Sequence, residues 1–413
     1  MPELRKLNDY ARLIVKEGVN LKPGQKLVIT VPAEHIVFAR ILQETAYQCG
    51  AGKVEFQFTD DFTDRNDLLY ASEDVLSSVR KSELLKRREQ QDDQSAFLHI
   101  VSDHPDSRSG VDELKAGRIR QARATAFRPL RAYTMNSQGQ WCVAAMPNED
   151  WAKQVFPEIR DAKQAEEALY QAIFHSVCLD QNGDPAENWR AHGDLIRCHC
   201  EVMNQYAFEA LHFRNAIGTD LLVPLVRDHI WGGGRELASK TGQWFDPNIP
   251  TEEIFTAPHC RKTEGKVVAS RPLYEDGQII DGFSFTFKKG KVAEWSAEKG
   301  ANTLASLLES DEGSMRLGEV ALVPYDSAIS NLNLLFFNTL FDENAACHLA
   351  LGACYPTSLK GGDSMRESQL KKAGGNVSSI HVDFMFGTED LTVDGIQADG
   401  TKTEVFRNGN FVF

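Results

Sequence analysis

In the first half of the chain, the spacing of the apolar residues alternates between that of a β-strand and that of an α-helix. Few folds are compatible with such a pattern. Strand-like runs occur at 26–32 (KLVITVP), 53–58 (KVEFQF) and 97–102 (FLHIVS). Helical spacing of the apolar positions precedes the first two runs, over 3–18 and 34–49. Because strand–helix–strand units pack as right-handed parallel sheets, we predict an α/β domain with a mainly parallel sheet.

The second half of the chain has a different pattern, made of short alternating runs separated by glycine turns. The runs occur at 221–226, 267–297 and 390–413, and the turns have the sequences EDG, KKG, ADG and RNG. Alternation with such turns is typical of antiparallel hairpins. Helical periodicity predicts an amphipathic helix over 298–310 and another over about 330–350. We therefore predict an α+β domain with antiparallel strands.

A polar, turn-rich stretch at 179–185 (LDQNGDP) separates the two patterns. It follows a charged segment from Phe156 to about Cys178 that we expect to be helical. Since 413 residues are too many for one ordinary core, we expect two domains, 1–185 and 186–413. The second holds most of the polar residues embedded in apolar runs, so we place the functional site there. The first would form a wall of the substrate cavity and carry no cofactor.

Composition argues against several classes of partner. The chain has 45 Lys and Arg against 59 Asp and Glu, a net charge of -14. An acidic protein gains nothing from counterion release, so we expect neither nucleic acid nor an anionic membrane as a partner. No apolar run approaches the roughly 20 residues of a membrane helix, and the N-terminus lacks the features of a secretory signal. With no dense cysteine framework, we expect a cytoplasmic protein.

A histidine and an aspartate stand two residues apart in the apolar run SSIHVDFMFG (378–387). If this run is a strand, His381 and Asp383 point to one face of it, while Val382 and Phe384 point to the other. Such a pair can chelate a metal ion. The alternative is a core histidine held by a neighbouring aspartate.

Two further carboxylates precede apolar runs that end at a proline. Glu253 lies in PTEEIFTAP (250–258), and Glu319 lies in RLGEVALVP (316–324). An acidic side chain beside a buried strand is unfavourable unless it is paired or bound to a cation. Periodicity does not choose between Glu253 and its neighbour Glu252, and a solvated strand end is the alternative for each glutamate.

The segment ENAACHLALGACYP (343–356) adds a histidine and a tyrosine. If residues 344–352 are helical, His348 lies on the same side as Tyr355, because a spacing of seven residues is nearly two turns. Gly352 lies between them and would end the helix early, leaving Tyr355 on a turn. A core histidine and a core tyrosine are the alternative.

Together these side chains offer oxygen and nitrogen ligands without a thiolate, a set suited to Zn²⁺, Co²⁺, Mn²⁺ or Mg²⁺. A carboxylate that bridges two ions about 3.5–4 Å apart is the usual arrangement for metal-assisted hydrolysis. The three carboxylates and a bridging hydroxide would balance the charge of two divalent ions. We therefore predict a dinuclear centre that activates water, with Tyr355 at the developing oxyanion. Its predicted ligands are Glu253, Glu319, His348, His381 and Asp383.

The sequence resembles a known family of metallo-aminopeptidases, typified by aminopeptidases T and S and by PepS. The segments EEIFTAP, GEVALVP, CHLALGACYP, HVDFMFG and DLTVDGI are similar to its signature segments and occur in the same order. NLKPGQKLVITVP, AGKVEF, WAKQVFP and the terminal GNFVF extend the resemblance over nearly the whole chain.

This resemblance implies a specific activity and a specific site. The activity would be removal of N-terminal residues from peptides by two divalent ions, in a homodimer that encloses the active site. The metal ligands would be the five side chains predicted above. Tyr355 would be an active-site tyrosine, and Glu319 is our candidate for the residue that bridges the metals.

Two other functions remain open at this point. Another dinuclear hydrolase, such as a phosphoesterase, uses the same types of ligand, although such sites usually add Arg or Lys for the phosphate. A binding protein without catalytic activity on the same fold is the second alternative.

Overall fold

The computed structural model describes residues 4–275 and 278–413. The chain forms two compact units, the first of Met1–Ala191 and Arg235–Ile249, the second of His192–Gly234 and Pro250–Phe413. Segment 235–249, which the sequence pattern assigned to the second half, thus belongs to the first unit. The division into domains 1–185 and 186–413 stays a prediction. None of the described helices is long and apolar enough to cross a membrane.

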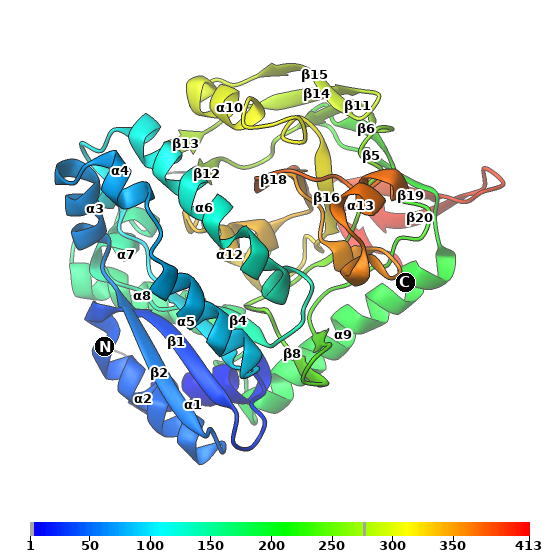
Figure 1. Cartoon of the computed structure of the whole chain (residues 1–413). Coiled ribbons are helices and arrows are strands. Elements are labelled where there is room, and N and C mark those ends of the chain that lie inside the picture. The colour runs from blue at the N-terminus through cyan, green and yellow to red at the C-terminus, as the bar shows by residue number, and fades with distance from the viewer. Residues whose placement is uncertain (1–3, 276–277) are drawn as a thin grey trace. The chain divides into compact units, whose positions relative to one another are not determined.

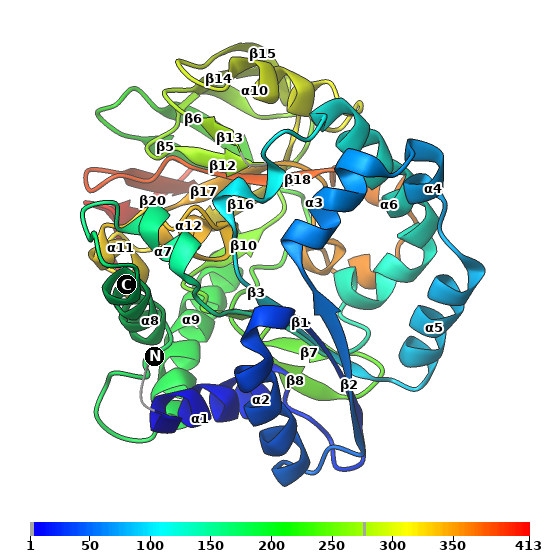
Figure 2. The same ribbon diagram turned by 90° about the vertical axis from the view of Figure 1, so that its left-hand side faces the viewer.

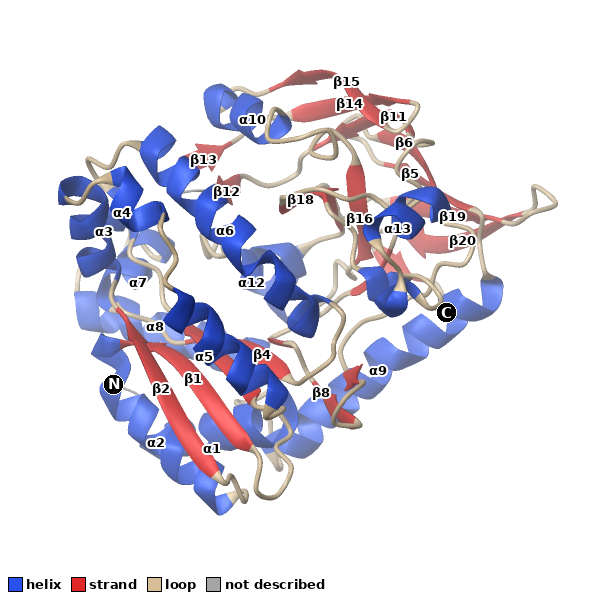
Figure 3. Ribbon diagram, in the orientation of Figure 1, coloured by secondary structure: helices blue, strands red, loops and turns tan. Residues whose placement is uncertain are grey.

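The first unit contains a five-stranded sheet in the order β2-β1-β3-β4-β9, with every neighbouring pair parallel. Figures 1 and 3 show this sheet. The predicted parallel α/β architecture is confirmed, and the three predicted strands are present within a residue or so of their expected bounds. The strands are β1 (Lys26–Pro32), β2 (Lys53–Thr59), β3 (Ala96–Val101), β4 (Trp141–Ala145) and β9 (Asn248–Ile249).

Helices cover both faces of this sheet. Two views show α1 and α2 on one side of β1 and β2, and α5 on the other (Figures 1 and 2). The predicted helices over 3–18 and 34–49 are present in their described parts, and the one expected over 156–178 is present from Ala162 to Ser176. The helices are α1 (Leu4–Leu13) with the π-helix Ile14–Gly18, α2 (Ile36–Gln48), α3 (Asp61–Tyr70), α4 (Glu73–Ser77), α5 (Lys81–Asp92), α6 (Glu113–Met135), α7 (Glu149–Val155) and α8 (Ala162–Ser176). Helix α9 (Pro185–Tyr206) begins in the first unit and ends in the second.

The second unit contains two antiparallel sheets, as predicted for an α+β domain. The larger has the order β15-β14-β11-β6-β5-β19-β20-β21, and the smaller has the order β10-β16-β17-β18. The larger comprises β5 (Ala210–Arg214), β6 (Asp220–Pro224), β11 (Glu264–Val268), β14 (Ser284–Lys288), β15 (Lys291–Ser296), β19 (Thr392–Ile396), β20 (Lys402–Arg407) and β21 (Asn410–Phe411). The smaller comprises β10 (Ile254–Thr256), β16 (Leu317–Leu322), β17 (His348–Gly352) and β18 (His381–Met385).

The core of the second unit joins these two sheets. Phe285 of β14 packs against Phe384 of β18 with ring centroids 5.1 Å apart, and both side chains are almost fully buried. Phe283 contacts both rings. Large aromatic side chains of this kind contribute much of the apolar area that a core removes from water. The smaller sheet is therefore held on one face by packing, which leaves its other face for polar residues.

Two short hairpins and several short helices complete the structure. Hairpin β7 (Glu236–Ala238) and β8 (Gln243–Phe245) belongs to the first unit, and β12 (Leu273–Glu275) and β13 (Gln278–Ile280) belong to the second. Most of the predicted EDG turn, residues 276–277, lies outside the described residues. The helices of the second unit are α10 (Ala301–Leu308), α11 (Ala328–Leu332), α12 (Thr339–Asp342) and α13 (Glu367–Ala373).

One secondary-structure prediction is wrong. The helix expected over about 330–350 is replaced by α11, α12, a 3₁₀ turn at Glu343–Ala345 and strand β17, so His348 lies on a strand. All five residues of β17 are buried. A fully buried strand is a continuous apolar run, and such a run has no period that separates it from a buried helix. The helix expected over 298–310 is confirmed as α10.

Candidate metal centre

The register of the smaller sheet places polar side chains on one face. Across the sheet, Ala350 lies opposite both Glu319 and Asp383. His348 lies two residues before Ala350, and His381 lies two residues before Asp383. Because residues directly opposite, and residues two apart in a strand, share a face of a sheet, all four polar side chains point to the same side. The small Ala350 side chain between them leaves space at the centre of the group.

A β-bulge at Gly318 sets the orientation of Glu319. Leu317 pairs with Leu351 but Glu319 pairs with Ala350, so β16 advances two residues where β17 advances one. Without the extra residue, Glu319 would lie opposite Leu349 and point to the apolar face. Bulges commonly re-aim side chains at functional sites in this way. A Cβ atom at Gly318 would lie 2.3 Å from the Ala353 carbonyl oxygen, so this position requires glycine.

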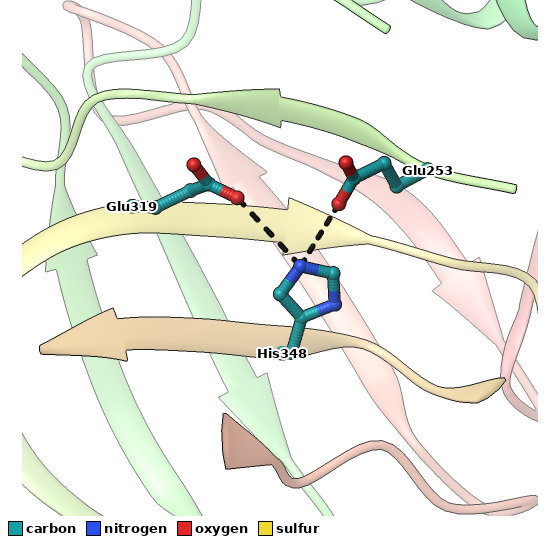
Figure 4. A group of neighbouring side chains, drawn as sticks. All are labelled: Glu253, Glu319 and His348. Carbon is teal, nitrogen blue, oxygen red and sulfur yellow. Dashed lines mark ion pairs between the residues drawn. The ribbon is translucent and has the colours of Figure 1, made fainter. Parts of the chain in front are cut away.

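The side chains form two groups of three that share Glu319. In the first, His348 Nε2 lies 2.9 Å from Glu253 Oε2 and 3.6 Å from Glu319 Oε1. Figure 4 shows these three side chains pointing toward one another from neighbouring segments. In the second, His381 Nε2 lies 3.7 Å from Glu319 Oε2 and 3.5 Å from Asp383 Oδ2. In each group the potential ligand atoms all lie within 4.8 Å of one another.

Both histidines direct Nε2 at the carboxylates because Nδ1 is held by the backbone. His348 Nδ1 lies 3.2 Å from the Ala346 carbonyl oxygen, and His381 Nδ1 lies 2.7 Å from the Ala353 carbonyl oxygen. A carbonyl can only accept, so the neutral form of each ring carries its proton on Nδ1, and its Nε2 lone pair can then bind a metal ion. Metal-binding histidines usually show this arrangement.

The buried carboxylate oxygens fit a cation. Glu253, Glu319 and Asp383 are 7%, 4% and 7% exposed. Three of their buried oxygens, Glu253 Oε2, Glu319 Oε2 and Asp383 Oδ1, lack a hydrogen-bond partner in the described part of the chain. Buried carboxylate oxygens that accept no hydrogen bond are unfavourable unless a cation neutralises their charge. The residues present therefore fit divalent ions, with oxygen and nitrogen donors on both groups.

The carboxylates dominate the electrostatics of the two imidazoles. Burial lowers the pKa of His381, but Asp383 and Glu319 outweigh this effect and raise it to about 10. Burial likewise lowers the pKa of His348, but Glu253 and Glu319 raise it well above its usual value. Burial raises the pKa of Glu319 to about 7, although both histidines act in the opposite direction. The centre therefore strongly favours positive charge.

Tyr355 lies beside the second group. Its ring centroid is 4.9 Å from that of His381 and 5.6 Å from that of Phe255, and the residue is half-buried. Burial, with Glu319 and Asp383 nearby, raises the pKa of the phenol well above its usual value. The hydroxyl therefore keeps its proton near neutral pH and is available as a hydrogen-bond donor. Tyr355 thus lies next to a proposed ligand, although not on a helix face shared with His348, and its role in the site stays a prediction.

Two glutamates next to the predicted ligands behave differently. Glu252, which periodicity could not separate from Glu253, has its Oε2 3.6 Å from His192 Nε2. Sequence analysis missed Glu343, whose pKa is raised by burial and by the negative charges of Asp383 and Glu253. Glu343 lies in a short 3₁₀ turn. Neither an apolar run nor a periodic pattern marks this residue, so only tertiary structure reveals it.

Comparisons with known proteins match the full length of the chain. Aminopeptidase 2 of Geobacillus stearothermophilus is 40% identical, with 99% of this chain and 98% of the relative covered. Aminopeptidase PepS of Streptococcus thermophilus is 37% identical, with 98% of each covered. The solved structure of wild-type AmpT from Thermus thermophilus superposes with a TM-score of 0.91 at 38% identity, and covers 99% of both chains.

The match to a family profile also covers nearly the whole chain. The sequence profile of the thermophilic metalloprotease (M29) family matches residues 4–411, which include both compact units and every residue of the candidate centre. The family resemblance noted from the sequence segments is confirmed by this match and by the named relatives. This chain therefore belongs to the thermophilic metalloprotease (M29) family.

Proposed function

We propose that this chain is an aminopeptidase that hydrolyses the first peptide bond of peptides with two divalent ions. The observation that carries the proposal is the pair of three-residue groups that share Glu319. Glu319 presents Oε1 to His348 and Oε2 to His381, so one carboxylate faces both groups. This geometry supports Glu319 as the residue that bridges the metals, with Glu253 and His348 on one side and His381 and Asp383 on the other.

The ligand types support the choice of metal. Two imidazoles and three carboxylates suit Zn²⁺, Co²⁺ or Mn²⁺, with Mg²⁺ as a weaker fit because it prefers oxygen ligands alone. When bound, such ions lower the pKa of a bound water and polarise the scissile carbonyl. The chain's own residues then have separate tasks. Glu319 and the other four ligands orient the reacting groups and exclude bulk water from a largely buried face of the sheet.

Two further residues are placed to act on the substrate. The Tyr355 phenol keeps its proton and is the donor that we assign to the developing oxyanion. A carboxylate must carry the proton from water to the leaving amine. Glu343 belongs to neither group of three, and because burial raises its pKa, we assign that transfer to Glu343.

The relatives named aminopeptidases support peptides with a free N-terminus as the substrate class. A centre rich in buried carboxylates also favours the ammonium group of such peptides. A cytoplasmic location, expected from the cysteine content, and a homodimer that encloses the site, implied by the sequence resemblance, remain part of this proposal.

Hydrolysis of aminoacyl-p-nitroanilides by the full-length protein tests the proposal. We expect turnover that disappears after thorough chelation with EDTA and returns when Co²⁺, Mn²⁺ or Zn²⁺ is added. p-Nitrophenyl phosphate serves as the parallel substrate and should not be turned over. Anilide turnover that survives chelation, or phosphate-ester turnover without anilide turnover, would contradict the proposal.

A further inference from the structure

A pocket of about 400 Å³ lies in the second unit, at the end of the smaller sheet. Its walls include Ser270 and Arg271 after β11, the loop between α11 and α12, Ala345 and Ala346 before β17, and Gly387 to Glu389 after β18. None of the five proposed metal ligands, all in the described part of the chain, lines it. Its volume lies within the range of about 300–1,000 Å³ that is usual for small-molecule sites.

The pocket contains a cation, Arg271, that forms no ion pair with the residues that the structure describes. The half-buried Arg271 donates a hydrogen bond from Nη1 to the Leu334 carbonyl oxygen at 3.1 Å. No carboxylate among the described residues lies within the 4.0 Å of an ion pair with its guanidinium. Burial lowers the pKa of Arg271, against the effect of the more distant Asp342. A partly desolvated guanidinium without an ion-pair partner is unfavourable by itself and is a common sign of an anion site.

The same pocket also offers a carboxylate, apolar side chains and a hydroxyl, which together suit a zwitterion that carries an apolar side chain. The exposed Glu389 lines it and offers a carboxylate. Pro272, Leu334 and Leu335 line it with apolar surface. Ser270 also lines it, and its buried hydroxyl has no hydrogen-bond partner in the parts of the chain that the structure describes.

We propose that this pocket, hereafter the Arg271 pocket, binds a free amino acid, with its carboxylate on Arg271 and its ammonium group toward Glu389. The planar guanidinium suits a carboxylate because it can donate two parallel hydrogen bonds. The side chain of the amino acid packs against Leu334 and Leu335. The choice of a free amino acid among zwitterions rests on the proposed function, because an aminopeptidase releases one in each turnover.

The Arg271 pocket shares a wall with the metal centre. Ala346 lines the pocket, and its carbonyl oxygen is the group that lies 3.2 Å from His348 Nδ1. A ligand in the pocket therefore lies against the backbone that orients a proposed metal ligand, although it touches none of the five.

Calorimetric titration of the full-length, EDTA-treated protein tests the inference without any need for turnover. The probes are L-leucine, 4-methylpentanoate, which lacks the ammonium group, and leucinamide, which lacks the carboxylate. We expect leucine to bind and each analogue to bind roughly tenfold more weakly or less, since each loses one charge-assisted contact. No binding of leucine would overturn the inference. Equal binding of 4-methylpentanoate would also overturn it, because the pocket would then be a general anion site.

Two variants locate the binding. Arg271→Gln should weaken leucine binding roughly tenfold or more, whereas the matched control Arg407→Gln, at an exposed arginine outside the pocket, should not. Glu389→Gln changes an exposed residue with little risk to folding, and should also weaken leucine binding while leaving 4-methylpentanoate unaffected. Leucine binding that survives both Arg271→Gln and Glu389→Gln would place it elsewhere and overturn the inference.

The test of amino-acid binding can fail or succeed independently of the test of the proposed aminopeptidase activity. Arg271→Gln should hydrolyse aminoacyl-p-nitroanilides as the unmodified protein does. If the unmodified protein hydrolyses no anilide, the proposed function fails while leucine binding to the Arg271 pocket still stands or falls by the titration.

Discussion

Glu252 and Glu253 are neighbours in the sequence, yet they contact different histidines. Glu253 Oε2 lies 2.9 Å from His348 Nε2, within the candidate centre. Glu252 Oε2 lies 3.6 Å from His192 Nε2, and the Glu252 backbone N–H donates to the Asn344 side chain. Both carboxylates are largely buried. At the scale of single residues, therefore, the direction of a side chain rather than its charge or burial decides which group belongs to the metal centre.

This difference predicts opposite outcomes for two equivalent substitutions. Glu253→Gln should weaken metal binding by about 100-fold or more, because a proposed direct ligand loses its charge. Glu252→Gln, the matched control, should leave metal affinity nearly unchanged. Metal titration monitored by calorimetry gives both affinities, with circular dichroism to confirm that each variant is folded. Equal losses in the two variants would show that net charge alone accounts for the effect.

Tyr355→Phe tests the role of oxyanion donor that we assign to the Tyr355 hydroxyl. Removal of the hydroxyl removes a donor that acts on the oxyanion, so kcat should fall by about 100-fold or more. Metal content and KM should change little, since the phenol is not among the proposed ligands. Steady-state kinetics with an aminoacyl-p-nitroanilide and metal analysis of the same sample check both expectations. A large rise in KM at unchanged kcat would assign Tyr355 to substrate binding instead.

The sequence predicts part of this residue-scale detail. The alternation in HVDFMFG correctly places His381 and Asp383 on one face of a strand, because the period of a strand fixes side-chain direction locally. Periodicity leaves Glu252 and Glu253 equivalent, since the deciding contacts come from α9 and β17. Glu343 escapes detection because it lies in a short 3₁₀ turn with no periodic pattern, and the carboxylates that raise its pKa, Asp383 and Glu253, are distant in sequence. The roles of all these residues as metal ligands stay predictions.

At the scale of secondary-structure elements, the β-bulge in β16 determines whether Glu319 reaches the candidate metal centre. It brings Glu319 onto the face that carries His348 and Asp383, and it depends on a close approach at Gly318. The two carbonyl oxygens of Gly352 and Ala353 would lie 2.4 Å and 2.3 Å from a Cβ atom at this position. A side chain there therefore requires the backbone to move.

Gly318→Ala should destabilise the protein by about 2 kcal/mol or more, since backbone clashes are among the larger causes of destabilisation. It should also lower metal affinity because Glu319 is displaced. The matched control is Gly193→Ala in α9, where nothing lies within 4 Å of the added Cβ. That change should be neutral or stabilise by up to about 1 kcal/mol. Chemical denaturation gives the free energies, and similar values for both variants would contradict the role of the bulge.

Elements in which the apolar residues show a clear periodicity are well predicted from the sequence, whereas a strand buried on both faces is not. Strands β1, β2 and β3 and helices α2 and α10 follow the expected ranges, because each has polar or turn-forming neighbours that mark its ends. Strand β17 was mistaken for part of a helix, because burial on both faces removes the alternation. The short strand β9 carries no signal of its own, and it pairs only because tertiary structure brings it beside β4.

At the scale of the whole molecule, the chain combines a parallel α/β unit with an antiparallel unit that contains every residue of the candidate centre. The sequence patterns predicted both architectures, because the two kinds of periodicity reflect local chain geometry. Residues 235–249 belong to the first unit although they follow part of the second unit in the sequence. Periodicity could not predict this, because contacts between segments that are distant in sequence leave no local pattern. The family profile spans both units.

The central claim is that the two groups joined by Glu319 bind two divalent ions. Metal analysis of the full-length protein after saturation with Zn²⁺ or Co²⁺ and removal of the excess tests it most directly, beside Glu319→Gln treated in the same way. We predict about two ions per chain for the unmodified protein, and clear loss from both positions in Glu319→Gln, because Glu319 belongs to both groups. A protein that retains no ion, or a Glu319→Gln variant that retains two as tightly, would contradict the account.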